Sequence, residues 1–432
     1  MSLCLKRRAR IMNKTVICDP AFGRLVKAEH PSGLKIFIME KPEFSSAHAV
    51  FGTHYGSIDT CFSTDGENFV TVPEGIAHFL EHKLFESEEG DAFSRFAKTG
   101  AYCNAYTSFD RTCYLFNCSG SFYENLEILL DFVQSPYFTA ETVKKEQGII
   151  GQEIKMYEDS PNWRVLFNML GAMYEKHPVK IDIAGTVESI AKIDDKLLFD
   201  CYNTFYNLSN MCLAIAGAVD AGKTLRVIEE NLKPSTPVTI YRKNEEEPKG
   251  VLKHYTEQQL AVASKLFCFG FKEDFDTPNR SRKERLVANL LIEILAGDSS
   301  ALYKTLTEKE LINDEFEGEY FCGPDYSVIF FSGESGDPEA VSKMITDEAA
   351  RLLEEGIDEE LFEAVKKSYY GDTVREFESL DGVVSNMLEA AFYNEDIFAT
   401  ELIKSITKQD IEERLKNLKA DSAVLSVVRG KE

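Results

Sequence analysis

The segment EGIAHFLEHKLFE, residues 74–86, decides how the rest of the sequence is interpreted. It holds two of the seven histidines in the chain, His78 and His82, with Glu81 between them. Residues three and four positions apart lie on one face of a helix, so these three side chains would project together. The apolar residues of the segment recur at the spacing of a buried helix, and they are Ile76, Phe79, Leu80, Leu84 and Phe85.

This arrangement predicts half of a catalytic zinc site. Two neutral imidazoles on adjacent turns of one helix can bind a single Zn²⁺. Glu81, on the same face, could accept a proton from water as a general base. The order His-x-x-Glu-His is the reverse of the His-Glu-x-x-His motif that binds zinc in many metallopeptidases. The alternative is a pair of histidines that only solvates one helix face.

A third ligand is needed, because catalytic zinc takes three protein ligands and leaves one position open. The segment 144–159, KKEQGIIGQEIKMYED, offers Glu146 and Glu153 on one face of a second helix. We expect three isoleucines to pack that helix inward, namely Ile149, Ile150 and Ile154. Either glutamate taken alone could equally be a solvated surface residue.

Length and composition indicate a globular protein of two domains. The 432 residues exceed one ordinary core, and the proline- and charge-rich segment 233–250 divides two well-patterned parts. We expect domains at 18–225 and 245–432. No apolar run approaches the ~20 residues of a membrane span. The basic segment 5–10 is not followed by an apolar stretch, so we expect no signal peptide and a cytoplasmic location.

Charge and cysteine usage argue against a nucleic-acid-binding protein and against a disulfide or zinc-thiolate protein. The net charge of −24 argues against a nucleic-acid partner, whose phosphates it would repel. The ten cysteines form no Cys-x-x-Cys pair, which favours reduced core residues over a disulfide or zinc-thiolate framework.

The chain also shows signs of an internal duplication. A helix-like segment followed by an apolar strand begins at Ser189 and again at Ser405, half a chain length apart. The tripeptide VKK occurs at 143–145 and at 365–367 in similar helical surroundings. Chance similarity between short amphipathic segments is the alternative. With strands grouped together and helices between the groups, the pattern predicts an α+β fold in which two homologous domains each pack helices on a mostly antiparallel sheet.

These residues resemble the pitrilysin or insulinase-like zinc peptidases, the inverzincins, over nearly the whole chain. The similarity is strongest to their short bacterial members and to the subunits of the mitochondrial processing peptidase. It is carried by several stretches, among them HYGSID (54–59), GIAHFLEH (75–82), NAYTSFDRTCY (104–114), EQGIIGQEIKMYEDSP (146–161), NMCLAIAGAVD (210–220) and GDSSALYKTLTEKELI (297–312).

The resemblance implies roles for individual residues. His78 and His82 match the zinc histidines of the family, Glu81 its catalytic base and Glu153 its third ligand. Glu146 matches a residue that supports the metal surroundings. A further pair, Asn104 and Ala105, matches the strand on which the family binds extended peptides. The interval between His82 and Glu153 is somewhat shorter than in the best-known members.

The second copy cannot hold zinc, so we expect one Zn²⁺ per chain. Aligning VANLLIEILAGD (287–298) with the opening segment places Leu290 and Ile294 at the histidine positions. Aligning the two VKK tripeptides places Ser368 and Arg375 at the positions of the two glutamates.

One departure from the family pattern lies in the second half of the chain and indicates that a partner subunit is needed. Members that complete the active site from their second half carry an arginine and a tyrosine there, which steady the developing oxyanion. Here Thr307 takes the arginine position, and the tyrosine position falls near Asn313 or Asp314. We therefore expect a heterodimer with a related, zinc-less subunit, or a homodimer failing that.

Two functions follow from these observations. The first is a zinc-dependent endopeptidase that hydrolyses peptides or small unfolded proteins. The alternative is a largely non-catalytic assembly or maturation subunit of a related peptidase complex. The intact His-x-x-Glu-His favours the first, and the missing Arg/Tyr pair keeps the second open.

Overall fold

A computed structural model describes residues 13–19, 22–88, 90–273 and 281–430. The basic segment 5–10 lies outside the described residues. The chain forms two compact units, and each takes segments from both halves of the sequence. Unit 1 comprises Met1–Ile150, Ile183–Lys243 and Val374–Phe398, and unit 2 comprises Gly151–Asp182, Asn244–Thr373 and Ala399–Glu432.

Unit 1 is built on a seven-stranded sheet in the order β1-β2-β3-β11-β4-β10-β9. The strands are β1 (Asn13–Asp19), β2 (Gly23–Glu29), β3 (Lys35–Glu40), β4 (Ala47–Thr53), β9 (Tyr102–Thr107), β10 (Thr112–Cys118) and β11 (Met211–Gly217). All neighbours are antiparallel except β3 and β11, which run parallel. Two small sheets accompany it: β12 (Tyr241–Arg242), β5 (Cys61–Ser63) and β6 (Val70–Thr71) form one, and β7 (Glu86–Ser87) and β8 (Gly90–Asp91) the other.

Unit 2 repeats this topology. Its sheet has the order β13-β17-β14-β16-β15, and only β13 and β17 run parallel. The strands are β13 (Tyr255–Gln259), β14 (Leu266–Lys272), β15 (Glu317–Gly323), β16 (Tyr326–Glu334) and β17 (Ala423–Arg429). The corresponding five strands of unit 1 are β3, β4, β9, β10 and β11. In each set of five, the last strand along the chain lies between the first two, and the third forms an edge of the sheet. The predicted duplication of one α+β unit is confirmed by this shared strand order.

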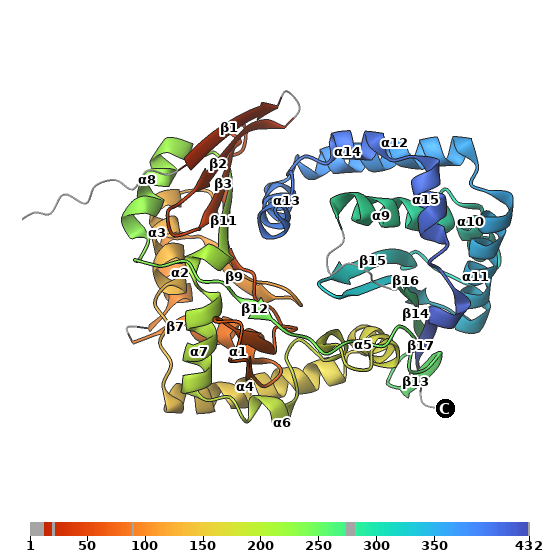
Figure 1. The fold of residues 1–432 in the computed structure, drawn as a ribbon, viewed down its shortest axis with the longest axis horizontal. Coiled ribbons are helices and arrows are strands. Elements are labelled where there is room, and N and C mark those ends of the chain that lie inside the picture. Colours follow the sequence, from red (N-terminus) through yellow and green to blue (C-terminus); the bar gives the residue numbers. More distant parts are fainter. Residues whose placement is uncertain (1–12, 20–21, 89, 274–280, 431–432) are drawn as a thin grey trace, which may run out of the picture. The chain divides into compact units, whose positions relative to one another are not determined.

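The helices of unit 1 lie on both faces of its sheet. These are α1 (Ile76–Leu84), α2 (Ala92–Thr99), α3 (Phe122–Val133), the first part of α4 (Ala140–Glu158), α6 (Val187–Ile190), α7 (Asp195–Phe205), α8 (Ala221–Asn231) and α13 (Leu380–Tyr393). Helices α3 and α8 run along one side of the sheet (Figure 1). Helix α13 comes from the second half of the chain, yet its Val383, Val384 and Met387 pack against Phe37, Val50, Cys212 and Ala214 of this sheet.

Unit 2 shows the reciprocal exchange. Its helices are the last part of α4, α5 (Pro161–Met173), α9 (Arg282–Ala296), α10 (Ala301–Glu308), α11 (Pro338–Glu355), most of α12 (Glu359–Glu376), α14 (Thr400–Ser405) and α15 (Lys408–Leu415). Three short 3₁₀ helices complete the described structure, at Pro178–Lys180, Leu208–Asn210 and Ala420–Ser422. Helix α5 belongs to the first half of the chain but contacts β14 and β17 of unit 2. The domain bounds 18–225 and 245–432 stay a prediction. The compact units do not follow them, because α5 of the first half belongs to unit 2 and α13 of the second half belongs to unit 1.

Two parts of the linker predicted at 233–250 make charged contacts, one within each unit. Arg242 pairs with the buried carboxylate of Asp59 in unit 1 at 2.6 Å. In unit 2 the Lys272 ammonium donates to Glu247 at 2.7 Å and to the carbonyls of Pro248 and Gly250. The contacts of Lys272 satisfy a buried cation within unit 2.

None of the described helices has by itself the length and apolarity of a membrane span; α9 and α10 meet those criteria only as a pair, bent by 43° at the break between them.

Candidate metal centre

Helix α1 carries the two histidines, and its start is fixed by a close backbone approach. Gly75 precedes the helix in a left-handed conformation (φ 85°). A side chain there would meet the carbonyl oxygen of Ala184 at 2.4 Å. The Ser189 hydroxyl donates to the carbonyl of Glu74 at 2.9 Å, which holds the same junction from the other side. The helix is thus anchored one turn before its first histidine.

The imidazoles of His78 and His82 lie next to each other on this helix, as the spacing predicts. Their ring centroids are 4.6 Å apart with the planes inclined by 63°. Around them the apolar side of α1 is buried, with Phe79 and Leu80 fully enclosed. The histidines are therefore presented from a rigid part of the core.

Helix α4 brings the third candidate ligand. One nitrogen of each histidine and one carboxylate oxygen of Glu153 all lie within 4.8 Å of one another. This is the only such group of three or more potential ligands among the residues that the structure describes. Two imidazoles and a carboxylate are the ligand set of known catalytic zinc sites, so the side chains fit the ion.

The packing of α4 differs from expectation at one residue. Ile150 and Ile154 are buried, at 0% and 4% exposed, but Ile149 is 47% exposed, so its predicted inward packing is wrong. Successive helix residues are about 100° apart, which places Ile149 beside the buried face rather than on it.

Glu146 lies beside the histidines as the resemblance implies. Its Oε1 is 3.0 Å from Nδ1 of His82, and the residue is only 5% exposed. A carboxylate at one ring nitrogen orients an imidazole so that the other nitrogen can bind a metal. Its geometry thus suits the supporting role predicted for it.

Glu153 has a second contact, which the sequence analysis did not identify. The Tyr157 hydroxyl donates to Oε1 of Glu153 at 3.0 Å, and the Tyr157 ring stacks on Trp163 of α5 with centroids 4.9 Å apart. The indole N–H of Trp163 donates in turn to Asp182 at 2.5 Å. The available signal was the four-residue step from Glu153 to Tyr157, which places both on one helix face.

Glu81 faces the end of strand β9. The hydroxyl of Thr107 donates to Oε2 of Glu81 at 2.6 Å. Sequence analysis missed Thr107 as well. The signal for it was its position two residues beyond Ala105, because alternate residues of a strand point to the same face.

Asn104 and Ala105 lie in β9, at the edge of the large sheet. Strand β9 pairs with β10 and ends the strand order among the described residues. Asn104 is exposed and Ala105 half-buried. On the same face as Asn104 stand Tyr102 and Tyr106, which are 61% and 41% exposed. An edge strand offers unpaired backbone donors and acceptors to another extended chain.

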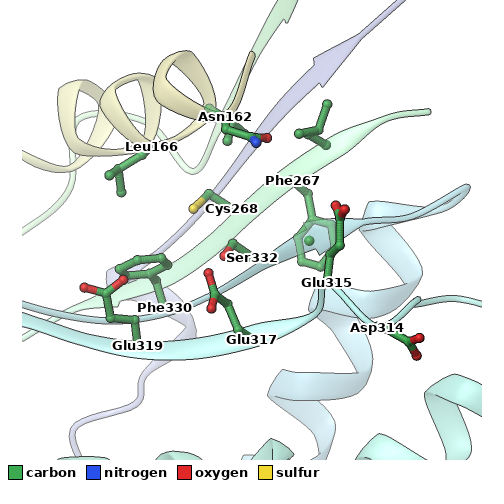
Figure 2. Close-up of a pocket in the computed structure, with 13 residues that line it drawn as sticks. Asn162, Leu166, Phe267, Cys268, Asp314, Glu315, Glu317, Glu319, Phe330 and Ser332 are labelled. Carbon is green, nitrogen blue, oxygen red and sulfur yellow. The ribbon is translucent and has the colours of Figure 1, made fainter. Parts of the chain in front are cut away.

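A separate hollow of about 480 Å³ lies within unit 2, between α5 and the sheet (Figure 2). Four acidic residues line it, namely Asp314, Glu315, Glu317 and Glu319. Burial, reinforced by the charge of Glu317, raises the pKa of Glu319. These carboxylates do not converge into a second metal-binding group within the described chain.

The second copy has apolar residues where the first has ligands. Leu290 and Ile294 of α9 are 0% and 1% exposed and belong to the core of unit 2. The resemblance assigns an arginine position to Thr307 and a tyrosine position near Asn313 or Asp314. The Thr307 hydroxyl donates to the carbonyl of Tyr303 within α10, and Asp314 lines the acidic hollow.

Comparison with known proteins decides the family. Residues 71–187 match the family model described as Insulinase (Peptidase family M16), and residues 192–369 match the model described as Peptidase M16 inactive domain. The chain belongs to peptidase family M16. The resemblance inferred from the sequence is thereby confirmed, and the match to the "inactive" model includes residues 245–369 of the copy that lacks the candidate metal ligands.

Relatives of this M16 chain carry matching names. It is 40% identical over 390 residues to the uncharacterized zinc protease YmfH of Bacillus subtilis, covering 88% of this chain and 90% of that protein. A solved M16-like peptidase from Alicyclobacillus acidocaldarius is 35% identical with a TM-score of 0.90, over 97% of this chain and 99% of that one. A protease from Helicobacter pylori, 19% identical with a TM-score of 0.78 over 97% of this chain and all of that one, shares the fold.

Proposed function

We propose that this chain is a zinc endopeptidase acting on peptides or small unfolded proteins. The observation that carries the proposal is the convergence of His78, His82 and Glu153 within 4.8 Å, with Glu81 on the helix that bears both histidines. The names of the zinc-protease relatives support the choice of metal. One Zn²⁺ per chain is expected, because α9 buries apolar residues at the corresponding positions.

The chemistry divides between the ion and the chain. A Zn²⁺ in such a site supplies Lewis acidity, which polarises a carbonyl and makes water more acidic. Glu81 would accept the proton released when water adds to the peptide carbonyl and then donate it to the leaving amide nitrogen. His82 is held in orientation by Glu146 during these steps.

The edge strand β9 suits an extended peptide substrate. A peptide that pairs with Asn104 and Ala105 would extend the sheet through backbone hydrogen bonds. Such pairing depends little on side chains, so we expect an enzyme with broad sequence tolerance.

We further propose that the active form is a heterodimer with a related, zinc-less subunit, with a homodimer as the fallback. The chain has Thr307 and Asp314 where related peptidases place the arginine and tyrosine that stabilise the oxyanion. A partner that supplied both groups would complete the site. The same absence favours the second candidate function, a non-catalytic assembly or maturation subunit.

The test is metal removal and reconstitution. The purified chain is stripped with a chelator, reloaded with Zn²⁺ and assayed against internally quenched peptides, alone and with a co-purified relative. We expect one zinc per chain, weak cleavage that returns with zinc, and a gain of about 10²–10³ with the partner. A zinc-loaded chain that cleaves nothing in either state would contradict the peptidase and favour the assembly subunit.

A further inference from the structure

Thr107 makes a contact with Glu81 that the sequence pattern did not predict. It is the last residue of β9, and its Oγ1 lies 2.6 Å from Oε2 of Glu81 on α1. The hydroxyl is the donor and the carboxylate oxygen the acceptor of this bond. Its length lies within the range of well-formed O–H···O hydrogen bonds.

The neighbouring hydroxyl of Thr112 is a weaker acceptor for the Thr107 proton than Glu81 is. Thr112 donates from its own Oγ1 to the carbonyl of Tyr55 at 2.9 Å, and both residues are fully buried. A hydroxyl has one proton, so that of Thr112 is committed to the carbonyl. The 3.4 Å contact between the two threonine oxygens is longer than the bond to Glu81, and it does not compete with it.

We infer that Thr107 is a positioning residue for the general base, an inference that rests on the proposed peptidase function. Its hydroxyl holds Oε2 of Glu81 and leaves the lone pairs of Oε1 to take the proton from water. Thr107 itself neither gains nor loses a proton: the proton taken at Oε1 goes on to the leaving amide nitrogen.

The contact also joins the base to the strand on which a substrate would lie. Thr107 belongs to β9, two residues after Ala105, so a peptide paired with β9 and the carboxylate of Glu81 are held by the same short segment. Misplacement of a reacting group by about 1 Å can cost on the order of 10²-fold in rate. Loss of the hydroxyl should therefore affect turnover much more than substrate binding.

Two variants separate positioning from packing. Thr107→Val removes the hydroxyl and keeps the branched shape, whereas Thr107→Ser keeps the hydroxyl. We expect Thr107→Val to lower kcat by about 10–100-fold with KM within about twofold, and Thr107→Ser to retain at least about a third of kcat. Zinc content should stay the same in both. Thr71→Val, an exposed threonine on β6, is the matched control and should behave as the parent. Unchanged kcat in Thr107→Val, or an equal loss in Thr107→Ser, would overturn the inference.

A structural readout does not depend on turnover. Crystal structures of the zinc-loaded parent and of Thr107→Val should show the Glu81 carboxylate displaced or disordered only in the variant. A carboxylate that keeps its position without the hydroxyl would contradict the positioning role even if the protein cleaves no peptide. Conversely, displacement in a protein without activity would support the contact and count against the proposed function alone.

Discussion

The Nδ1 atom of His82 lies 3.0 Å from Oε1 of Glu146, a carboxylate buried on α4 seven residues before Glu153. When His82 donates from Nδ1, its other nitrogen presents a lone pair to a metal. The two glutamates of α4 thus have different positions relative to the site: one can bind the ion, and the other orients a ligand.

Replacing Glu146 should weaken zinc binding without abolishing it. We expect Glu146→Ala to lower zinc affinity by about 10–100-fold and Glu146→Gln by less, because the amide oxygen can still accept from Nδ1. Competition with a chromophoric chelator measures both. Parent-like affinity in both variants would show that the buried carboxylate does not act on the site.

Tyr157 should also affect zinc affinity, because its hydroxyl holds the candidate ligand Glu153 as Glu146 holds His82. Tyr157→Phe removes the hydroxyl that donates to Glu153 and should lower zinc affinity several-fold. Tyr241→Phe, at an exposed tyrosine, is the control. The chain has one tryptophan, Trp163, which stacks on Tyr157 and provides a fluorescence signal. A zinc titration that leaves this signal unchanged would argue against Glu153 as a ligand.

Pairing of a peptide with β9 predicts a periodic response to backbone methylation. Successive amides of a strand point alternately toward and away from its neighbour. A single N-methyl group moved along a quenched peptide should therefore raise KM at every second position, by about 2–10-fold for each hydrogen bond lost. A response without this two-residue period would exclude edge-strand binding.

The buried ion pair of Asp110 with Arg111, to which Tyr393 of α13 also donates, should set part of the acid stability. Asp110 is 6% exposed and contacts Arg111 at 2.9 Å and the Tyr393 hydroxyl at 2.5 Å. Burial disfavours its charge, but the Arg111 guanidinium outweighs this and lowers the pKa of Asp110 to about 2. A folded-state pKa below the unfolded value gives stability that is present above pH ~4 and is lost as the pH falls toward 2.

Asp110→Asn is the corresponding test. Removing one partner of a buried pair should lower the free energy of unfolding near pH 7 by about 3 kcal/mol and flatten its dependence between pH 4 and 2. The control Asp131→Asn breaks the exposed pair with Arg95 and should cost less than about 1 kcal/mol. Urea denaturation at several pH values measures both. If the free energy of unfolding of Asp110→Asn still falls as steeply between pH 4 and 2 as that of the parent, the acid sensitivity comes from other carboxylates.

Local spacing explains why much of this site could be predicted from the sequence. The steps between His78, Glu81 and His82 fix their common face through helix geometry alone. Some strands of both sheets are short apolar or alternating runs in the sequence, such as 34–39 and 265–271, which become β3 and β14. The choice of each candidate ligand therefore follows from local pattern together with the family resemblance.

The rest depends on packing between distant segments. An apolar face on α5 or α13 does not say which of two similar sheets it will cover, so the exchange of these helices was not predicted. The contact of Thr107 with Glu81 joins a strand end to a helix 26 residues earlier, and the alternation of the strand gives the face of Thr107 but not the helix residue that it meets. Hydrogen bonds of this kind become visible only once the elements are placed.

The most direct test of the account is the zinc content and peptidase rate of Glu81→Gln beside the parent chain, both reloaded with Zn²⁺ and assayed with the same partner. Glu81 is expected to act as base and not as ligand, so the variant should keep one zinc per chain and lose cleavage by about 10²–10⁴-fold. Cleavage at the parent rate, or loss of the metal from the variant, would contradict the central claim.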